Sequence, residues 1–276
     1  MVKYGHYTSP LGLINIVSNQ VLWASNIKYL NDEHEFQHAL DLIKDIMSNV
    51  KIDRGQDGYQ VSRQYIAAIE EELSKLDEHT VDSIFTTSFT KELDLLSQWR
   101  GYCHDNNGFC IAMDLDKVYK SVGASYHDAH LLECVYDKSR KEEDLRNLLN
   151  SKYVDYSSSV NNVEKATVIS DLVSDITLMA SCYKHPSFSE EQEKRIVVLL
   201  KDSELSRVDF RQGTFSLIPY IELNVDRDHI KEVVIGPCSN KKLSKRSLQA
   251  FLHKQYSSVP WETGPVVKIS ETPYRS

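Results

Sequence analysis

Residues 188–200, FSEEQEKRIVVLL, join an acidic segment to an uninterrupted apolar run. The apolar run predicts a buried strand, because a strand covered on both faces does not alternate polar with apolar residues. Side chains two positions apart in an extended chain face the same side, so we expect Glu191 and Glu193 to point together. Arg195 is next along that side. We therefore expect the two acids at the start of a rigid strand.

Two interpretations of these acids are open. A run of charges is often a solvated loop, and Arg195 would then be an internal ion-pair partner. Alternatively, closely spaced carboxylates serve glycosyl chemistry, in which a fixed negative group stabilises positive charge developing on a sugar carbon. One carboxylate can also accept a hydrogen bond from a ribose hydroxyl and orient it.

A second polar pattern, YGHYTS, occupies residues 4–9. If this segment is extended, His6 and Thr8 face one side and Tyr7 faces the other. The shared polar direction indicates a pocket. A surface strand with a solvated histidine is the alternative interpretation.

The rest of the chain predicts one α+β domain over residues 1–276, with a helical insertion at about 140–182. No Pro/Ser/Gly-rich linker and no internal repeat divides it. We expect the strands at 83–90 and 108–115 to be neighbours, and 51–58 to be a polar loop. Buried helix stripes are expected at Leu11, Ile14 and Val17 and at Phe36, Leu40, Ile43 and Met47. Strands are predicted at 20–25, 83–90, 108–115, 131–137, 194–201, 215–223 and 230–236, and helices at 9–19, 32–50, 59–76, 94–102 and 241–254.

Bulk composition bounds the class of protein. The chain has 276 residues, 41% hydrophobic and 26% charged, which is typical of a globular protein. Its five cysteines form no C-x-x-C pair, which argues against a zinc knuckle or a disulfide framework. The amino terminus lacks a signal-peptide apolar region, and no aliphatic run could cross a bilayer. We therefore expect a cytoplasmic protein without a membrane partner.

The net charge of −8 disfavours broad, non-specific binding to nucleic acid. One local exception is KKLSKRSLQAFLHK, residues 241–254, which holds six Lys, Arg or His residues and no acid. Its apolar residues, Leu243, Leu248, Phe251 and Leu252, have helical spacing. The segment is either an amphipathic helix with a solvated basic face or a nucleic-acid contact.

Three of these patterns, in this order, resemble the ADP-ribosyltransferase superfamily: H-x-[ST] on a first strand, a Ser/Thr-rich central strand, and E-x-E at the mouth of a late strand. The resemblance implies a split mixed β-sheet core with helical insertions, NAD as co-substrate, and transfer of ADP-ribose to a nucleic-acid or protein acceptor. It also implies a toxin or phage-defence effector, with an antitoxin protein as a further partner. It assigns catalysis to Glu193, Glu191 and His6, and NAD binding to His6, Tyr7, Thr8, Tyr29, Asn31, Ser88, Thr90 and Arg195.

The chain also resembles a poorly characterised bacterial family over nearly its whole length. The marks are YGHYTS, LWASNIKYLNDEHE, TSFT, QWRGY, GFCIAMDL, FSEEQEKR, IPYIEL and VVIGP. Many transferases have glycine where this chain has Tyr7, and SFT replaces their S-T-S form. The aromatic residue that flanks nicotinamide is left open among Trp23, Tyr29, Trp99 and Tyr102.

The acidic stretch LNDEHE, residues 30–35, allows another function. Asn31, Asp32, Glu33 and Glu35 with a histidine would suit a divalent cation, which implies a metal-dependent hydrolase or nuclease. Helix capping is their simpler role. Asn31 and Asp32 could instead brace the NAD pocket. A third possibility is a non-catalytic nucleotide-sensing or interaction module of a defence system.

Overall fold

The computed structural model describes residues 3–30, 35–48, 56–76, 83–103, 107–213, 216–257 and 264–273. By backbone contacts the chain groups into two compact units. Met1–Ser25, Phe85–Glu133 and Glu190–Ser276 form the first, here called the sheet unit, and Asn26–Ile84 with Cys134–Ser189 form the second, the helical unit. The single domain over residues 1–276 stays a prediction.

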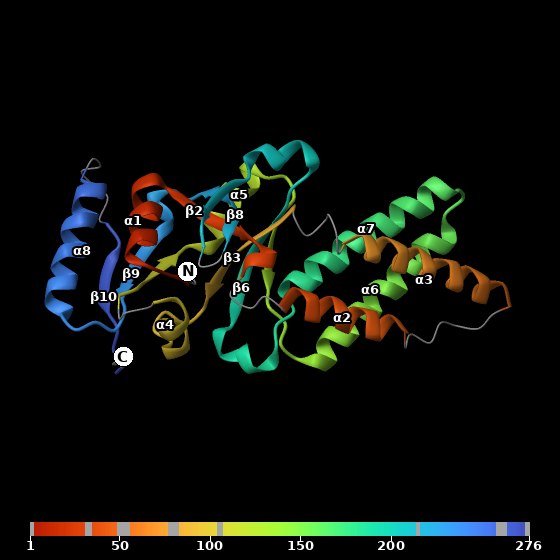
Figure 1. Cartoon of the computed structure of the whole chain (residues 1–276), viewed down its shortest axis with the longest axis horizontal. Helices are drawn as coiled ribbons and strands as arrows, with labels where there is room; N and C mark the ends of the chain where they lie inside the picture. The colour runs from red at the N-terminus through yellow and green to blue at the C-terminus, as the bar shows by residue number, and fades with distance from the viewer. Residues whose placement is uncertain are drawn as a thin grey trace. The chain divides into compact units, whose positions relative to one another are not determined.

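The mixed α/β architecture contains a ten-stranded, mostly antiparallel sheet (Figure 1). Its main path runs β10-β9-β4-β1-β3-β2-β8-β7, and β6 pairs with both β3 and β5. β10 runs parallel to β9. The strands are β1 (Tyr4–Thr8), β2 (Val21–Asn26), β3 (Ile84–Thr90), β4 (Phe109–Met113), β5 (Ala129–Glu133), β6 (Glu193–Leu199), β7 (Asp209–Gln212), β8 (Leu217–Asn224), β9 (Ile230–Ile235) and β10 (Val266–Ile269).

The prediction that 83–90 and 108–115 are neighbouring strands is wrong. β4 pairs with β1 over its length, for example Tyr7 with Cys110, and with β9 on its other side. The amino-terminal strand therefore lies between β4 and β3. Proximity in the sequence suggested a direct pairing, but a strand from the chain start takes that position.

Four helices belong to the sheet unit: α1 (Pro10–Asn19), α4 (Leu96–Tyr102), α5 (Leu115–Ser125) and α8 (Lys241–Tyr256). As predicted, Ser9 caps α1, where its hydroxyl accepts a hydrogen bond from the Gly12 amide at 3.1 Å. The predicted buried stripe of α1 is wrong in part. Leu13, Ile16 and Val17 are buried, whereas Leu11 and Ile14 are exposed. The same holds for Leu243, which is exposed on α8.

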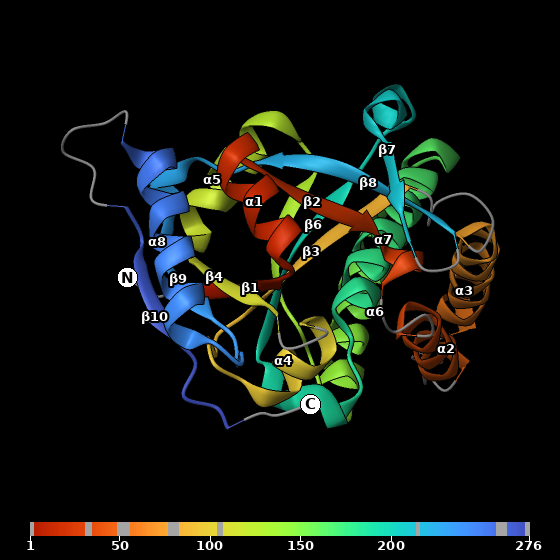
Figure 2. The same ribbon diagram turned by 60° about the vertical axis from the view of Figure 1, so that its left-hand side comes forward.

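The main core of the sheet unit lies between one face of the sheet and its helices. α1 contacts β1 and β4, α5 contacts β5 and β8, and α8 runs along β9 and β10 (Figure 2). Alternate residues of β4 and β9, such as Ile111 and Val233, enter this core. Their immediate neighbours along the strands, Cys110 and Val234, enter a smaller cluster around Trp99. This alternation is the period-two pattern of a strand with two covered faces.

The helical unit contains α2 (Glu35–Ser48), α3 (Gln56–Leu76), α6 (Lys138–Ser158) and α7 (Asn162–Cys182). The predicted stripe of α2, from Phe36 to Met47, is buried and so confirmed. Tyr65 of α3 packs against Tyr153 and Tyr156 of α6 and donates to the Leu149 carbonyl at 3.0 Å. α6 and α7 cover the predicted insertion at about 140–182.

Two sequence predictions differ from the structure at the ends of elements. Residues 56–58 begin α3, so the predicted loop 51–58 is wrong there, and 51–55 lie outside the described residues. The four-residue strands β7 and β10 were not predicted. The described residues also form short 3-10 helices: η1 (Ile27–Tyr29), η4 (Pro186–Glu191), η5 (Asp202–Arg207) and η6 (Arg227–His229). Within the described ranges, no helix combines the length and apolar character that a bilayer span requires.

Candidate functional site

A pocket lies in the sheet unit beside the pairing of β1 with β3. The two strands pair at Gly5 with Thr90. Gly5 also leaves room for the Cys110 side chain of β4, because a Cβ on Gly5 would lie 2.4 Å from the Cys110 sulfur. The pocket occupies about 340 Å³, counting its open mouth. Its lining consists of Gly5, His6, Tyr7, Ser88, Phe89, Thr90, Gln98, Tyr102, Glu191 and Glu193.

His6 connects β1 to β3 at this pocket. Its Nδ1 lies 3.0 Å from the Ser88 carbonyl oxygen, which can only accept a hydrogen bond. Nδ1 therefore carries the proton, and Nε2 of the neutral ring is an acceptor. Burial lowers the pKa of His6, and the Ser88 carbonyl opposes this shift only in part. The ring is thus held neutral, with one acceptor nitrogen available for a ligand hydroxyl.

Lowering the pH should cost stability through His6. Because its folded pKa lies below the ordinary 6.5, the folded state resists protonation. The contribution of neutral His6 is complete above the unfolded pKa and is lost as pH falls through the folded pKa. We expect the free energy of unfolding to fall more steeply below pH 6.5 in the wild type than in His6→Gln. Urea unfolding from pH 7.5 to 5 measures this, and parallel curves for both proteins would contradict it.

The two acids of E-x-E reach the pocket by a route that the sequence did not predict. Glu191 ends η4 and Glu193 begins β6, while Gln192 between them has a φ of 42°. That value lies in the left-handed region, which a non-glycine residue adopts at an energetic cost. The expectation of plain extended geometry is therefore wrong, although both side chains line one pocket. The Thr90 hydroxyl donates to the Glu191 carbonyl at 2.5 Å and ties this bend to β3.

Glu193 forms a buried ion pair with Arg195. The Arg195 Nε donates to Glu193 Oε1 at 2.6 Å, and the two side chains are 4% and 6% exposed. The ion pair of that interpretation is thus observed, but Glu191 and Glu193 are buried, so the solvated loop is wrong for them. The arginine fixes the orientation of the Glu193 carboxylate. Arg195 itself is absent from the pocket lining.

Tyr7 and Thr8 have mainly structural contacts. The Tyr7 ring packs edge-on against Trp99, at 4.6 Å between centroids. Its hydroxyl donates to the Glu92 carbonyl and accepts from the Leu95 amide. Burial raises the pKa of Tyr7. Thr8 lies against the first turn of α1, and its hydroxyl fills the space that a side chain on Gly12 would need.

Of the four aromatic candidates for flanking nicotinamide, Tyr102 lines the pocket. It is 40% exposed and shares the lining with Gln98, four residues earlier on α4. Residues four apart lie on the same helix face, so this spacing was the signal for Gln98, which sequence analysis missed. Trp99 is fully buried and Trp23 stacks on Tyr220. The remaining candidates lie elsewhere: Tyr29 belongs to η1 of the helical unit, and Asn31 lies outside the described residues.

Trp99 links several of the motifs that carry the family resemblance. Its cluster contains Tyr7 of YGHYTS, Cys110 of GFCIAMDL and Val234 of VVIGP. Gly236 of VVIGP faces the indole so closely that a Cβ on it would lie 2.9 Å from the ring. These motifs are therefore explained in part by packing around one indole, separately from any chemistry at the pocket.

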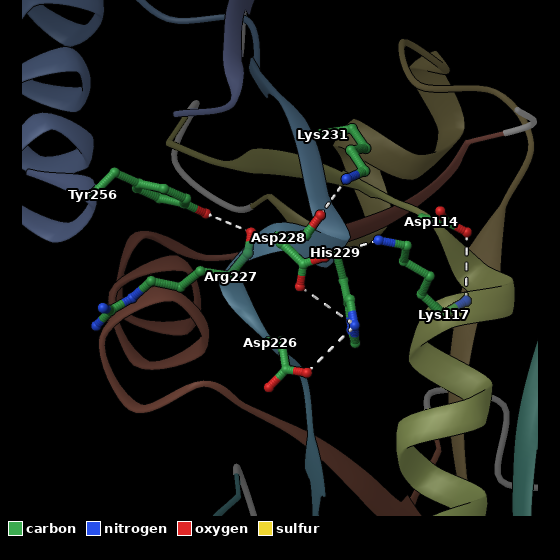
Figure 3. A network of polar contacts seen from close by, with 8 residues as sticks. All are labelled: Asp114, Lys117, Asp226, Arg227, Asp228, His229, Lys231 and Tyr256. Atoms are coloured by element: carbon green, nitrogen blue, oxygen red, sulfur yellow. Dashed lines mark hydrogen bonds and ion pairs between the residues drawn. The ribbon is translucent and has the colours of Figure 1, made fainter. Parts of the chain in front are cut away.

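A group of metal-binding side chain types lies elsewhere in the sheet unit, at Asp226, Asp228 and His229 (Figure 3). Part of its charge is compensated by a lysine. Lys117 donates to Asp228 Oδ2 at 2.8 Å, and the His229 Nε2 lies 3.5 Å from Asp226. The hydroxyl of Tyr256 donates to the Arg227 carbonyl, which ties α8 to this turn. The network therefore serves as a structural connection. Sequence analysis did not single out this group. The metal ligands that it did suggest, Asn31 to His34, lie outside the described residues, as does the side chain of Glu35.

Comparison with known protein families gives one match. Residues 98–196 match the family described as Protein of unknown function (DUF2971). The matched segment begins in α4 and ends in β6, so it contains Gln98, Tyr102, Glu191 and Glu193 and leaves out His6. No curated protein and no solved structure gives a significant match. The chain thus resembles a family without an assigned activity.

Proposed function

We propose that the chain is an NAD-dependent ADP-ribosyltransferase with an ADP-ribosyltransferase-like split sheet. The observation that supports this most is the common pocket of His6 and Glu193, which are distant in the sequence. Tyr7, Ser88 and Thr90, which the resemblance also assigns to NAD, line the same pocket, whereas Thr8, Tyr29 and Arg195 are not part of its lining. β3 pairs with β6 in addition to its partners on the main path, and we interpret this branching as the split of the sheet.

The lining of the pocket bears on how NAD would bind. The space of about 340 Å³ includes solvent at an open mouth. We place the reacting ribose and the nicotinamide against the lining residues, with the adenosine half outside the mouth. Nε2 of His6 accepts a hydrogen bond from a ribose hydroxyl. Tyr102 offers an aromatic face to the nicotinamide ring, and the amide of Gln98 suits its carboxamide.

The proposed reaction breaks the bond between the ribose carbon and the nicotinamide nitrogen, and the bonding electron pair leaves with nicotinamide. The carboxylate of Glu193 stabilises the positive charge that develops on the ribose carbon. Arg195 positions this carboxylate through their ion pair. A nucleophilic atom of the acceptor then bonds to the ribose carbon and gives up its proton. Glu191, beside Glu193, is suited to take that proton or orient the acceptor.

The acceptor we propose is a macromolecule, either nucleic acid or protein. As in the toxin-type transferases that the sequence resembles, such a reaction would make the chain a toxin or phage-defence effector, restrained by an antitoxin protein.

Release of nicotinamide tests the proposal directly. Purified protein is incubated with NAD labelled in the nicotinamide ring, with and without cell extract. We expect free labelled nicotinamide, and transfer of label to extract when the adenylate is labelled instead. NAD that raises the melting temperature without any turnover would identify a nucleotide-sensing module. No release and no shift would end the assignment of NAD to this pocket.

A further inference from the structure

The solvent face of α8 carries a concentrated positive charge. Lys241–Tyr256 contains five Lys or Arg residues, one His and no acid, in a chain whose net charge is −8. Leu248, Leu252 and Tyr256 bury the opposite side of the helix in the core of the sheet unit. Lys242 and Arg246 stand on the exposed side. The cationic face is therefore held rigidly by the fold.

The first turn of α8 places its charges against the helix dipole. Lys241 and Lys242 occupy the positive end of the helix, where no acid is present. Cations at this end are unfavourable, while an anion there is stabilised. Lys241 donates to the Ser270 carbonyl at 3.1 Å, which offsets a part of this cost. An anionic partner would relieve the rest.

The cations form two groups along the helix. Lys241, Lys242, Lys245 and Arg246 lie at its start, and His253 and Lys254 lie at its end. The exposed residues between them are short or uncharged: Ser247, Gln249 and Ala250. With a rise of about 1.5 Å per residue, the two groups are about 15 Å apart. The major groove of B-DNA is about 12 Å wide and admits one α-helix between its two rows of phosphates.

We propose that α8 docks in the major groove of duplex DNA, with one cationic group on each phosphate strand and Gln249 toward the base edges. The charge complementarity and the spacing support this partner. Duplex RNA does not fit, because its A-form major groove is too narrow and deep for a helix. The proposed DNA binding does not depend on the proposed NAD chemistry, because binding of the duplex is measured without NAD.

Fluorescence anisotropy with a labelled 20-base-pair DNA duplex tests the surface. With about four phosphate contacts, affinity should fall about a hundredfold between 50 and 200 mM salt. In the double variant Lys242→Gln with Arg246→Gln, the salt slope should fall by about two. The matched control, Lys91→Gln with Lys120→Gln, removes two exposed charges outside α8 and should bind as the wild type does.

A second variant removes no cation. Ala250→Glu places an acid in the middle of the exposed face, where glutamate suits a helix and the fold should persist. We expect at least tenfold weaker DNA binding with an unchanged melting temperature. Equal or tighter binding of duplex RNA, single-stranded DNA or a polyglutamate peptide overturns the proposal. Absence of salt-sensitive DNA binding, or equal loss in the Lys91/Lys120 control, overturns it as well.

Discussion

Glu193→Gln should slow nicotinamide release by about two to three orders of magnitude, because it removes the charge that faces the reacting carbon. Glutamine keeps the size of the side chain, and its carbonyl oxygen can still accept from Arg195 Nε, which lies 2.6 Å from Glu193 Oε1. The loss should therefore appear in the rate rather than in the fold. Single-turnover measurement at saturating NAD separates this effect from weaker binding.

The neighbouring acid supplies the control for this experiment. Glu190 is exposed, belongs to the same segment and is absent from the pocket lining. Glu190→Gln changes the net charge equally and should retain full activity. If Glu193→Gln also retained it, or if both variants lost it equally, Glu193 would have no catalytic role.

Trp99→Ala should have the largest effect on stability, a loss of about 3–5 kcal/mol in the free energy of unfolding. The indole is fully buried. It packs against Tyr7, and its Nε1 donates to Asp94 Oδ1 at 2.7 Å. Removing it opens a cavity at the meeting point of β1, β4, β9 and α4. Urea unfolding followed by circular dichroism measures the change.

Two further substitutions divide this loss into its causes. Trp99→Phe keeps most of the ring but removes the hydrogen bond to Asp94, so it should cost less than alanine. Asp94→Asn keeps the ring and weakens that bond; Asp94 also accepts from Ser270 and the Glu271 amide. A loss below about 1 kcal/mol for Trp99→Ala would show that the cluster is not a packing centre.

Sequence patterns predicted the elements of this fold better than their pairing. The apolar run at 196–200 and the stripe of α2 follow directly from periodicity. The position of β1 between β4 and β3 does not, because pairing depends on contacts between segments distant in the chain. Periodicity also misplaced the buried face of α1, since Leu11 and Ile14 fit the same repeat as the residues that the core selects.

At the candidate site too, the sequence identified some residues and missed others. The residue types at His6, Ser88 and Glu193 could be identified from short motifs, and the structure brings these three to one pocket. Gln98 belongs to no such motif, and its four-residue spacing from Tyr102 was its only signal in the sequence. The left-handed backbone of Gln192 could not be predicted from the sequence either. Glycine is the usual marker of this conformation, and position 192 is not a glycine.

The strand order has a consequence for how copies of this chain meet one another. Its main path ends in β10 on one side and β7 on the other, and each has only four residues. Short terminal strands offer few unpaired backbone groups to a foreign strand. Lys268 on β10 and Asp209 with Arg211 on β7 add charge to these borders. These two borders of the sheet are thereby protected against edge-to-edge aggregation.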